Sequence, residues 1–303
     1  MFIILNRKRF FILSGALVLA ALLSITVFGL KLGTDFTGGT LAQATYAGGR
    51  PAPEALSVAL DEAGFVGYSL REANENDYIL RAANLTAEQR ENIEEILSVG
   101  GESPVVIAQL TDVGPTIGKE LRNKALVAIV LVMTAILLFI AFAFRKVSKP
   151  ISSWVYGGIA LVTLGFDVLI PIGFYAFLGA LTGAQVDTLF VTAVLTVLGY
   201  SVHDTIVVFD RTRENLRINQ EKNRREDFAE TAGRALQQTF VRSVTTSFTT
   251  GLALLALYLL GPESTTHFAL TLLVGIVAGT YSSIFLATPL LVAVERRRGQ
   301  KGK

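Results

Sequence analysis

The hydrophobic positions of this sequence fall into long runs that carry no charge. Four of these runs cover residues 10–30, 125–144, 243–262 and 264–294, and a charged residue bounds each of them. At about 1.5 Å per helical residue, a run of about 20 residues crosses the ~30 Å hydrocarbon core of a bilayer. The pattern therefore predicts a membrane-spanning helix in each run.

A fifth apolar stretch, residues 151–209, is too long for one span. Small and polar residues cluster at 179–187 and mark a turn, so the stretch predicts two helices, at about 153–178 and 188–209. The total is then six spans. The first run of the chain is long for a signal peptide and lacks a clear cleavage site, so we interpret it as an uncleaved anchor.

Residues 31–124, between the first two spans, are hydrophilic and show a different periodicity. Two segments, 53–63 and 86–99, have helix-start residues and a following glycine, and predict helices. Four alternating or β-branched segments predict strands, at 41–46, 67–72, 77–82 and 104–110. The order βαββαβ is typical of the ferredoxin-like split βαβ unit. We therefore expect an α+β domain inserted between helices 1 and 2.

Composition narrows the possible classes of protein. The chain has 303 residues, of which 51% are hydrophobic and 17% charged, no cysteine and two histidines. These counts exclude disulfide scaffolds, thiolate metal sites and sites built from several histidines, so we expect no metal. A net charge of +2 without a basic block argues against nucleic acid as a partner.

The charges are distributed unevenly along the chain. The insert 31–124 has 8 Lys+Arg against 14 Asp+Glu, a net charge of −6, while the rest has 19 against 11, a net charge of +8. The 19 basic residues lie in four segments, 1–9, 145–149, 210–242 and 295–303. Basic residues favour the cytoplasmic side of a membrane. The pattern predicts that both termini are cytoplasmic and that the insert lies on the opposite side.

Two acidic residues, Asp167 and Asp204, fall within the predicted spans, and Arg242 stands at the start of the fifth. Because an ionisable group costs about 2.5–3.5 kcal/mol at mid-membrane, it is a candidate functional residue. Polar residues accompany these three at helical spacing, in the rows Thr163–Asp167, Thr192–Thr196–Tyr200–Asp204 and Arg242–Thr246–Thr249. We expect each row to share one face and to turn away from lipid. A buried Asp near an Arg alternates between a paired anion and a neutral acid, which is the chemistry of a proton relay.

Structural roles are the alternatives for these positions. Asp167 and Asp204 would then only hydrogen-bond neighbouring helices, Arg242 would reach toward the interface, and the threonines would pack helices together. His203 either extends a proton path or is a satisfied interfacial residue. Gly275 and Gly279 form a GxxxG motif that predicts a helix–helix contact.

Three motifs resemble those of one family. They are TDFTGGT at 34–40, VGPTIGKELR at 113–122, and GYSVHDTIVVFDRTREN at 199–215. With Arg242 at the start of span five, the chain resembles the SecF branch of the SecD/SecF family, subunits of bacterial protein export. The motif positions that carry the resemblance are Asp35, Gly38, Gly39, Gly114, Pro115, Gly118 and Gly199.

The resemblance implies an architecture. It is an RND-type half of six membrane helices with an extracytoplasmic domain, in the bacterial cytoplasmic (inner) membrane. We divide the chain into residues 1–30 (tail and helix 1), 31–121 (extracytoplasmic α+β domain), 122–295 (helices 2–6) and 296–303 (basic cytoplasmic tail).

The resemblance also implies a function and partners. The chain would be no enzyme but an accessory subunit that uses the proton-motive force to move unfolded preproteins, with protons as the coupling ion and no cofactor. Its implied partners are a SecD-like subunit, the SecYEG channel, YajC and the SecA-engaged complex.

The family motif assigns roles residue by residue. The positions matching Asp204 and Arg242 form the charged membrane pair tied to proton movement, and Asp167 matches a recurrent acidic position. We expect Tyr200, Thr196 and His203 to modulate the relay. His203 departs from the usual Asn, which changes the hydrogen bonding expected around Asp204. The charged stretch 218–233 is longer than usual, and we interpret it as a solvated helical extension.

Two other functions fit part of the pattern. One is half of a proton-driven RND exporter of small solutes. The other is an intramembrane aspartyl protease, in which two carboxylates share a proton. The protease is disfavoured because the residues around Asp167 and Asp204 lack its GxGD and YD motifs.

Overall fold

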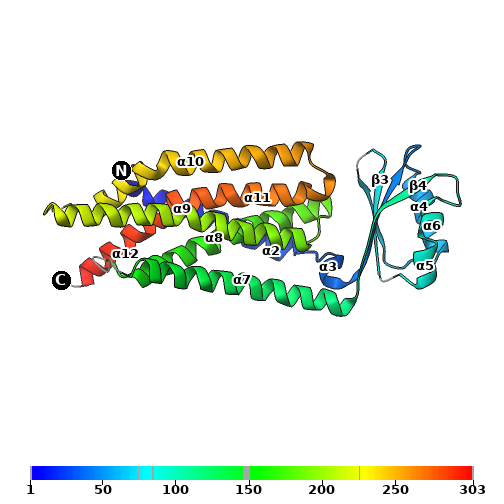
Figure 1. The fold of residues 1–303 in the computed structure, drawn as a ribbon, viewed down its shortest axis with the longest axis horizontal. Coiled ribbons are helices and arrows are strands. Elements are labelled where there is room, and N and C mark those ends of the chain that lie inside the picture. Colours follow the sequence, from blue (N-terminus) through cyan, green and yellow to red (C-terminus); the bar gives the residue numbers. More distant parts are fainter. Residues whose placement is uncertain (1, 74, 84, 146–150, 225, 302–303) are drawn as a thin grey trace. The chain divides into compact units, whose positions relative to one another are not determined.

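The computed structural model describes residues 2–73, 75–83, 85–145, 151–224 and 226–301. The chain forms two compact units (Figure 1). The helical unit comprises Met1–Lys31, Val127–Ala184 and Leu189–Lys303, and the α+β unit comprises Leu32–Leu126 and Gln185–Thr188. The short segment Gln185–Thr188 therefore packs with Leu32–Leu126, which lies far from it in the sequence.

Among these described residues, six helices are long and apolar enough to cross a membrane. Five of them are α2 (Arg7–Phe28), α7 (Pro115–Ala143), α8 (Ser153–Thr182), α9 (Thr188–Glu221) and α10 (Phe228–Leu260). The sixth is made of α11 (Glu263–Ser282), the π-helical turn η1 (Ser283–Ala287) and α12 (Thr288–Lys301), and a short helix, α1 (Phe2–Leu5), precedes α2. The six predicted spans are confirmed, and the chain is a multi-pass membrane protein.

Three aromatic side chains, those of Phe144, Tyr156 and Phe209, pack together in one core of the helical unit. The rings of Tyr156 and Phe209 lie 5.2 Å apart, and those of Phe144 and Tyr156 lie 5.3 Å apart. Phe228 and Ala232, at the start of α10, are buried in the same core. The interpretation of 218–233 as a solvated extension therefore agrees with the exposed residues 220–224 but is wrong from Phe228 onward. The apolar residues of this stretch recur at i, i+1 and i+4 and form a buried helix face between the charges.

Small residues allow close helix contacts. A Cβ on Gly275 would lie 2.2 Å from Val197 Cγ2, and a Cβ on Gly279 would lie 2.9 Å from Ser201 Cβ and Oγ. The predicted GxxxG contact of α11 is thus confirmed, and its partner is α9.

The π-helical turn η1 interrupts the last span, where the hydrophobic run predicted only a continuous helix. Such turns are frequent at functional sites. Its first residue, Ser283, shares a buried hydrogen bond of 2.8 Å with Thr205 of α9. The irregular turn therefore lies against the helix that carries Asp204.

The α+β unit contains one four-stranded sheet. Its elements in chain order are α3 (Thr34–Thr37), β1 (Gly39–Tyr46), α4 (Pro53–Glu62), β2 (Ser69–Ala73), β3 (Asp77–Ala82), α5 (Ala87–Glu91), α6 (Ile93–Leu97) and β4 (Val105–Val113). The strand order is β2-β3-β1-β4, every pair is antiparallel, and α4, α5 and α6 lie on one face (Figure 1). The strands and helices follow the predicted order, except that two short helices meeting at Asn92 replace the second one.

Two tyrosines mark the core of this unit. Tyr46 and Tyr78 are buried with their rings edge to face at 5.9 Å, and the Tyr46 hydroxyl donates to the Leu97 carbonyl at 2.9 Å. Burial, followed by the nearby Tyr78, raises the pKa of Tyr46. Such a core is stable only with its polar atoms paired, and this hydrogen bond ties β1 to α6.

Candidate functional site

Asp167, on α8, is completely enclosed by protein. Its side chain is 0% exposed, and the hydroxyl of Ser201 on α9 donates to its Oδ2. The hydroxyl of Ser282 on α11 lies beside the same carboxyl. Within the described residues its Oδ1 has no hydrogen-bond partner and the carboxyl has no ion pair. Because a buried carboxyl without an ion pair is costly, its presence on this membrane helix marks Asp167 as a candidate functional residue.

The residue one turn before Asp167 is equally buried. Thr163 is 0% exposed, and its hydroxyl donates to the backbone carbonyls of Ile159 and Ala160. The expectation that Thr163 and Asp167 share an inward face is confirmed. The Thr163 hydroxyl thus finds its acceptors on its own helix and does not need the Asp167 carboxyl as one.

Asp204, on α9, lies at the boundary between α9 and α10. Its side chain is 6% exposed, and its Oδ1 lies 3.9 Å from Nδ1 of His203. Ser243 of α10 lies beside the carboxyl. Asp204 Oδ2 and Ser243 Oγ are both buried, and in the described part of the chain neither has a hydrogen-bond partner. The site therefore holds an acceptor and a donor that a small shift would join.

Arg242 precedes Ser243 on α10 and is exposed. Its guanidinium is within electrostatic reach of Asp204, but the described residues contain no ion pair between the two. The two predicted partners are therefore near each other but not in contact in this structure. Arg242 also lines a cavity of about 310 Å³ on the adjoining part of α9 and α10, with Val207, Asp210, Arg211, Glu214, Gln238 and Thr239.

The polar rows on α9 and α10 are less covered than expected. Thr192, Thr196 and Thr249 are exposed, and only Tyr200 and Thr246 are half-buried. For this chain by itself, the prediction that both rows turn inward is confirmed at Asp204, which is buried, and is wrong at Thr192, Thr196 and Thr249. Periodicity places residues on one face, but it does not determine what covers that face. The Thr196 hydroxyl donates to the Thr192 carbonyl at 2.7 Å, which lowers the cost of its exposure.

Tyr200 begins a hydroxyl network across three helices. Its hydroxyl donates to Ser247 Oγ of α10 at 3.3 Å and lies 3.5 Å from Thr250 Oγ1. Thr280 of α11 donates to the same Ser247 oxygen at 2.6 Å. The network joins α9, α10 and α11 one turn from Asp204.

The sequence patterns did not indicate the three serines of the site, Ser201, Ser243 and Ser282. Each is a small hydroxyl residue in an apolar run, and each lies beside one of the two predicted carboxyls. A serine three residues before or one residue after a predicted site residue was the only signal, and it is weak because serine is common in membrane helices.

The glycine motifs pack backbone against backbone. Gly38 and Gly39 have φ values of +81° and +135°, and a Cβ on them would lie 2.7 Å from Pro115 Cα and 2.5 Å from the Ala82 carbonyl oxygen. A Cβ on Gly118 would lie 2.8 Å from Gly38 N. Both the backbone conformation and the space therefore require glycine. Pro115 fits as the first residue of α7.

Two other motif glycines have open surroundings. A Cβ on Gly114 or Gly199 would meet no atom within 4 Å. Nothing in the structure explains the choice of glycine there.

The motif aspartate Asp35 binds the segment before α9. Its Oδ2 accepts from the backbone N–H of Thr188 at 2.8 Å and from the Thr188 hydroxyl. Gly33 N donates to the Val186 carbonyl at 2.8 Å. The first motif thus makes two sets of contacts, one with the second motif and one with residues 186–188.

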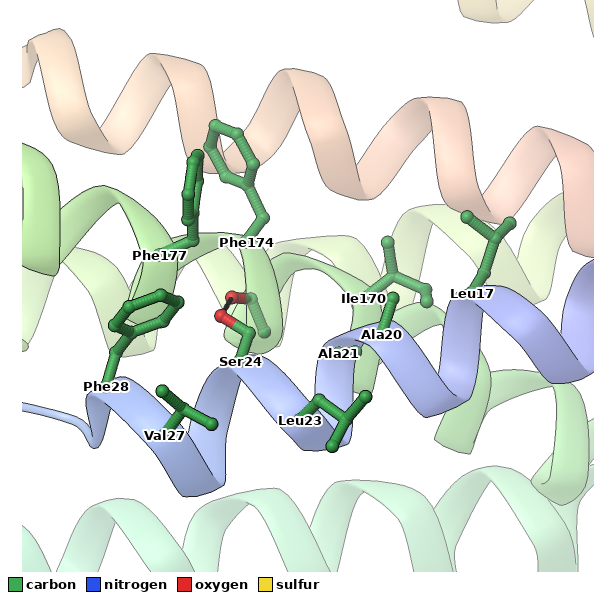
Figure 2. A pocket seen from close by; sticks show the side chains of 11 residues that line it. Leu17, Ala20, Ala21, Leu23, Ser24, Val27, Phe28, Ile170, Phe174 and Phe177 are labelled. Atoms are coloured by element: carbon green, nitrogen blue, oxygen red, sulfur yellow. Dashed lines mark hydrogen bonds between the residues drawn. The ribbon is translucent and has the colours of Figure 1, made fainter.

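A cavity of about 450 Å³ lies away from these groups, between α2 and α8 (Figure 2). Its lining is apolar except for Ser24, whose hydroxyl donates to the Gly173 carbonyl at 2.6 Å. Phe28, Phe174 and Phe177 close one end (Figure 2). No titratable side chain lines the cavity, so it offers no proton chemistry.

Comparison with known proteins gives two family matches. The profile of the C-terminal part of protein export membrane proteins SecD/SecF matches residues 94–297. The profile of the SecD/SecF GG motif matches residues 23–47. Together they include both candidate carboxyls and the first glycine motif.

Full-length relatives are also similar. The protein translocase subunit SecF of Thermobaculum terrenum is 41% identical, over 96% of this chain and 93% of the relative. That of Anaerolinea thermophila is 36% identical, over 96% and 92%. The protein translocase subunit SecDF of Thermus thermophilus is 35% identical, over 95% of this chain and 38% of the relative.

A solved structure has the same fold. The crystal structure of SecDF, a translocon-associated membrane protein from Thermus thermophilus, superposes with a TM-score of 0.80 and 32% identity, over 96% of this chain and 38% of that chain. Profile, sequence and structure agree, and the chain belongs to the SecD/SecF family of protein export membrane proteins.

Proposed function

We propose that this chain is an accessory subunit of the Sec machinery that couples the proton-motive force to movement of preproteins across the bacterial cytoplasmic membrane. The observation that carries the proposal is the Asp204 site. It combines a carboxyl that is 6% exposed, a neighbouring hydroxyl without a partner, and a guanidinium within electrostatic reach but not in contact. Such a site supports both a charged and a neutral carboxyl.

A change of charge at Asp204 has a mechanical consequence. Ionised, the carboxyl attracts Arg242 and accepts a hydrogen bond from Ser243; protonated, it releases the attraction. One proton that crosses 100 mV supplies about 2.3 kcal/mol, enough to bias a two-state conformation. Asp167, with Ser201 and Ser282, is a second protonation site in the same proposal, and Tyr200, Thr196 and His203 adjust the first. Protons are the only coupling ion, and no metal or cofactor takes part.

The uncovered polar face of α9 and α10 supports a SecD-like partner. Thr192, Thr196, Thr249 and Arg242 are exposed on membrane-spanning helices, and polar side chains in such helices rarely face lipid. The Thermus thermophilus SecDF chain extends well beyond the 38% that this chain matches. We propose that a SecD-like subunit covers this face, and that the SecYEG channel, YajC and the SecA-engaged complex are the further partners.

The domain boundaries are also part of the proposal. Residues 31–121 form a ferredoxin-like extracytoplasmic domain that acts on the emerging chain, and the helices belong to an RND-type half-unit with both termini in the cytoplasm. The strand order β2-β3-β1-β4 and the net charge of −6 on residues 31–124 support this assignment.

The test is export by membrane vesicles with a controlled proton gradient. We expect Asp204→Asn to keep assembly with the partners but to lose gradient-dependent export. Asp227→Asn is the matched control, because it makes the same chemical change at an exposed carboxylate before α10. Normal gradient-dependent export by Asp204→Asn would refute the proposed function.

A further inference from the structure

Two distant segments of the α+β unit are bound side by side. Leu32 and Val186 form a parallel bridge, and the Gly33 N–H donates to the Val186 carbonyl at 2.8 Å. A Cβ on Gly33 would lie 3.0 Å from that carbonyl oxygen, so the two backbones are in close contact. Asp35 completes the contact by accepting both hydrogen bonds of Thr188.

Thr188 connects this contact to the helix of Asp204. It is the first residue of α9, which continues without a break to Glu221. Asp204 lies sixteen residues after Thr188 on this helix, a distance of about 24 Å along the axis. The bonded end of α9 and the candidate proton site therefore belong to one continuous helix.

Asp35 connects the same contact to the sheet. Three residues after it, Gly38 packs on Pro115, and β1 begins at Gly39. β1 is an inner strand that pairs with both β3 and β4. Asp35 is therefore only four residues from the first residue of a strand in the middle of the sheet.

The chemistry of the contact makes it strong. A carboxylate at the first N–H of a helix satisfies a donor that has no partner within the helix, and it lies at the positive end of the helix dipole. The Thr188 hydroxyl adds a second charge-assisted hydrogen bond to the same oxygen. Asp35 is half-buried, which limits screening by water.

We propose that Asp35 is a positioning residue that fixes the start of α9 to the segment entering β1, so that movement of α9 at the proton site is passed to the sheet. This inference rests on the proposed function. It gives the aspartate of the TDFTGG motif a task distinct from proton transfer, namely the link between the proton site and the α+β unit. A simple helix cap would stabilise the fold without this link.

The experiment separates proton movement from export. The chain, reconstituted with its SecD-like partner and the channel, is assayed for proton flux and for gradient-dependent export. We expect Asp35→Ala to lower export about 10-fold while proton flux stays within about twofold of the wild type. Asp35→Asn and Thr188→Val each keep part of the contact and should give intermediate export. Asp61→Asn, an exposed carboxylate on α4, is the control.

Three results would overturn the inference. They are wild-type export by Asp35→Ala, an equal loss of flux and export, and an additive further loss in the double variant Asp35→Ala/Thr188→Val. Asp35→Asn keeps the test valid if the alanine variant does not fold. Failure of the proposed function has a different signature, because Asp204→Asn would then keep gradient-dependent export whatever Asp35 does.

Discussion

The two carboxyls within the membrane helices differ in their surroundings more than in their burial. Asp167 is enclosed by α8, α9 and α11, with hydroxyls as its polar neighbours. Asp204 lies next to the uncovered face of α9 and α10, with His203 at 3.9 Å and Arg242 within electrostatic reach. Each leaves one carboxyl oxygen without a partner. The two sites therefore differ in access and in nearby charge rather than in depth of burial, and under the proposed function this difference makes Asp204 the carboxyl that exchanges protons.

Replacing each carboxyl by the corresponding amide tests the difference between the two sites most directly. We expect Asp204→Asn to lower gradient-dependent export by about 100-fold or more, the scale of a lost proton-transfer group. Asp167→Asn should cost only about 10-fold, because its amide oxygen still accepts from Ser201. Export rates in vesicles measure both. An Asp167→Asn defect as large as that of Asp204→Asn would reverse the assignment of the two sites.

Substitutions of Arg242 test whether a positive charge is needed near Asp204, whereas Asp167 has none near it among the described residues. Since the guanidinium acts on Asp204 without contact, Arg242→Lys should keep export within about threefold, while Arg242→Gln should lose about 10-fold. The same vesicle assay applies. Equal losses in both variants would mean that a direct, bidentate Arg–carboxylate contact forms during the cycle.

The enclosure of Asp167 depends on Gly279. An alanine there would place Cβ 2.9 Å from Ser201 Cβ and Oγ, so Gly279→Ala should destabilise the protein by about 1–3 kcal/mol. Thermal unfolding in detergent measures the effect. Gly251→Ala is the control, since its Cβ would meet only Leu273 Cδ1, at an ordinary 3.6 Å. Equal unfolding temperatures for the two variants would show that α9 and α11 are not tightly packed at Ser201.

The smallest expected effect concerns a carboxylate outside the spans. Burial raises the pKa of Glu226, but hydrogen bonds from Asn219 and Thr231 and the nearby Arg234 outweigh it, and the net pKa lies below the ordinary 4.5. A lowered folded-state pKa stabilises the fold above the unfolded value, and this contribution is lost as pH falls through the folded pKa. Glu226→Gln should lower the unfolding temperature by about 2 °C at pH 7.

Acid should remove that difference. Once the pH falls below the folded-state pKa of Glu226, which lies below the ordinary 4.5, the wild type and Glu226→Gln should unfold at similar temperatures, since both side chains are then neutral. A difference that is independent of pH would show that the carboxylate charge contributes nothing to the loop between α9 and α10.

Much of the fold could be predicted because the bilayer limits which residues a membrane-spanning helix can contain. Charge-free runs such as 10–30 and 125–144 became α2 and α7, since a bilayer requires about 20 apolar residues in a helix. Asp167 and Asp204 were found because charge is rare in such runs. The paired glycines 38 and 39 were found as a motif, and the structure supplies the reason in positive φ and close backbone contact.

The rest depends on tertiary contacts that leave little trace in one sequence. The burial of Phe228 could not be predicted because charged residues surround it in the sequence. The turn at Ser283–Ala287 could not be predicted because its residues are as apolar as those of a membrane α-helix. Thr196 is exposed because none of the described residues covers that surface. The bond from Thr188 to Asp35 joins residues 153 positions apart, which no local pattern indicates.

Proton movement through the reconstituted complex tests the central claim most directly. A pH-sensitive dye enclosed in proteoliposomes that contain the chain and its SecD-like partner reports flux under an imposed gradient. The account predicts flux in the wild type that Asp204→Asn abolishes, with Asp227→Asn unchanged. Wild-type flux in Asp204→Asn would contradict it.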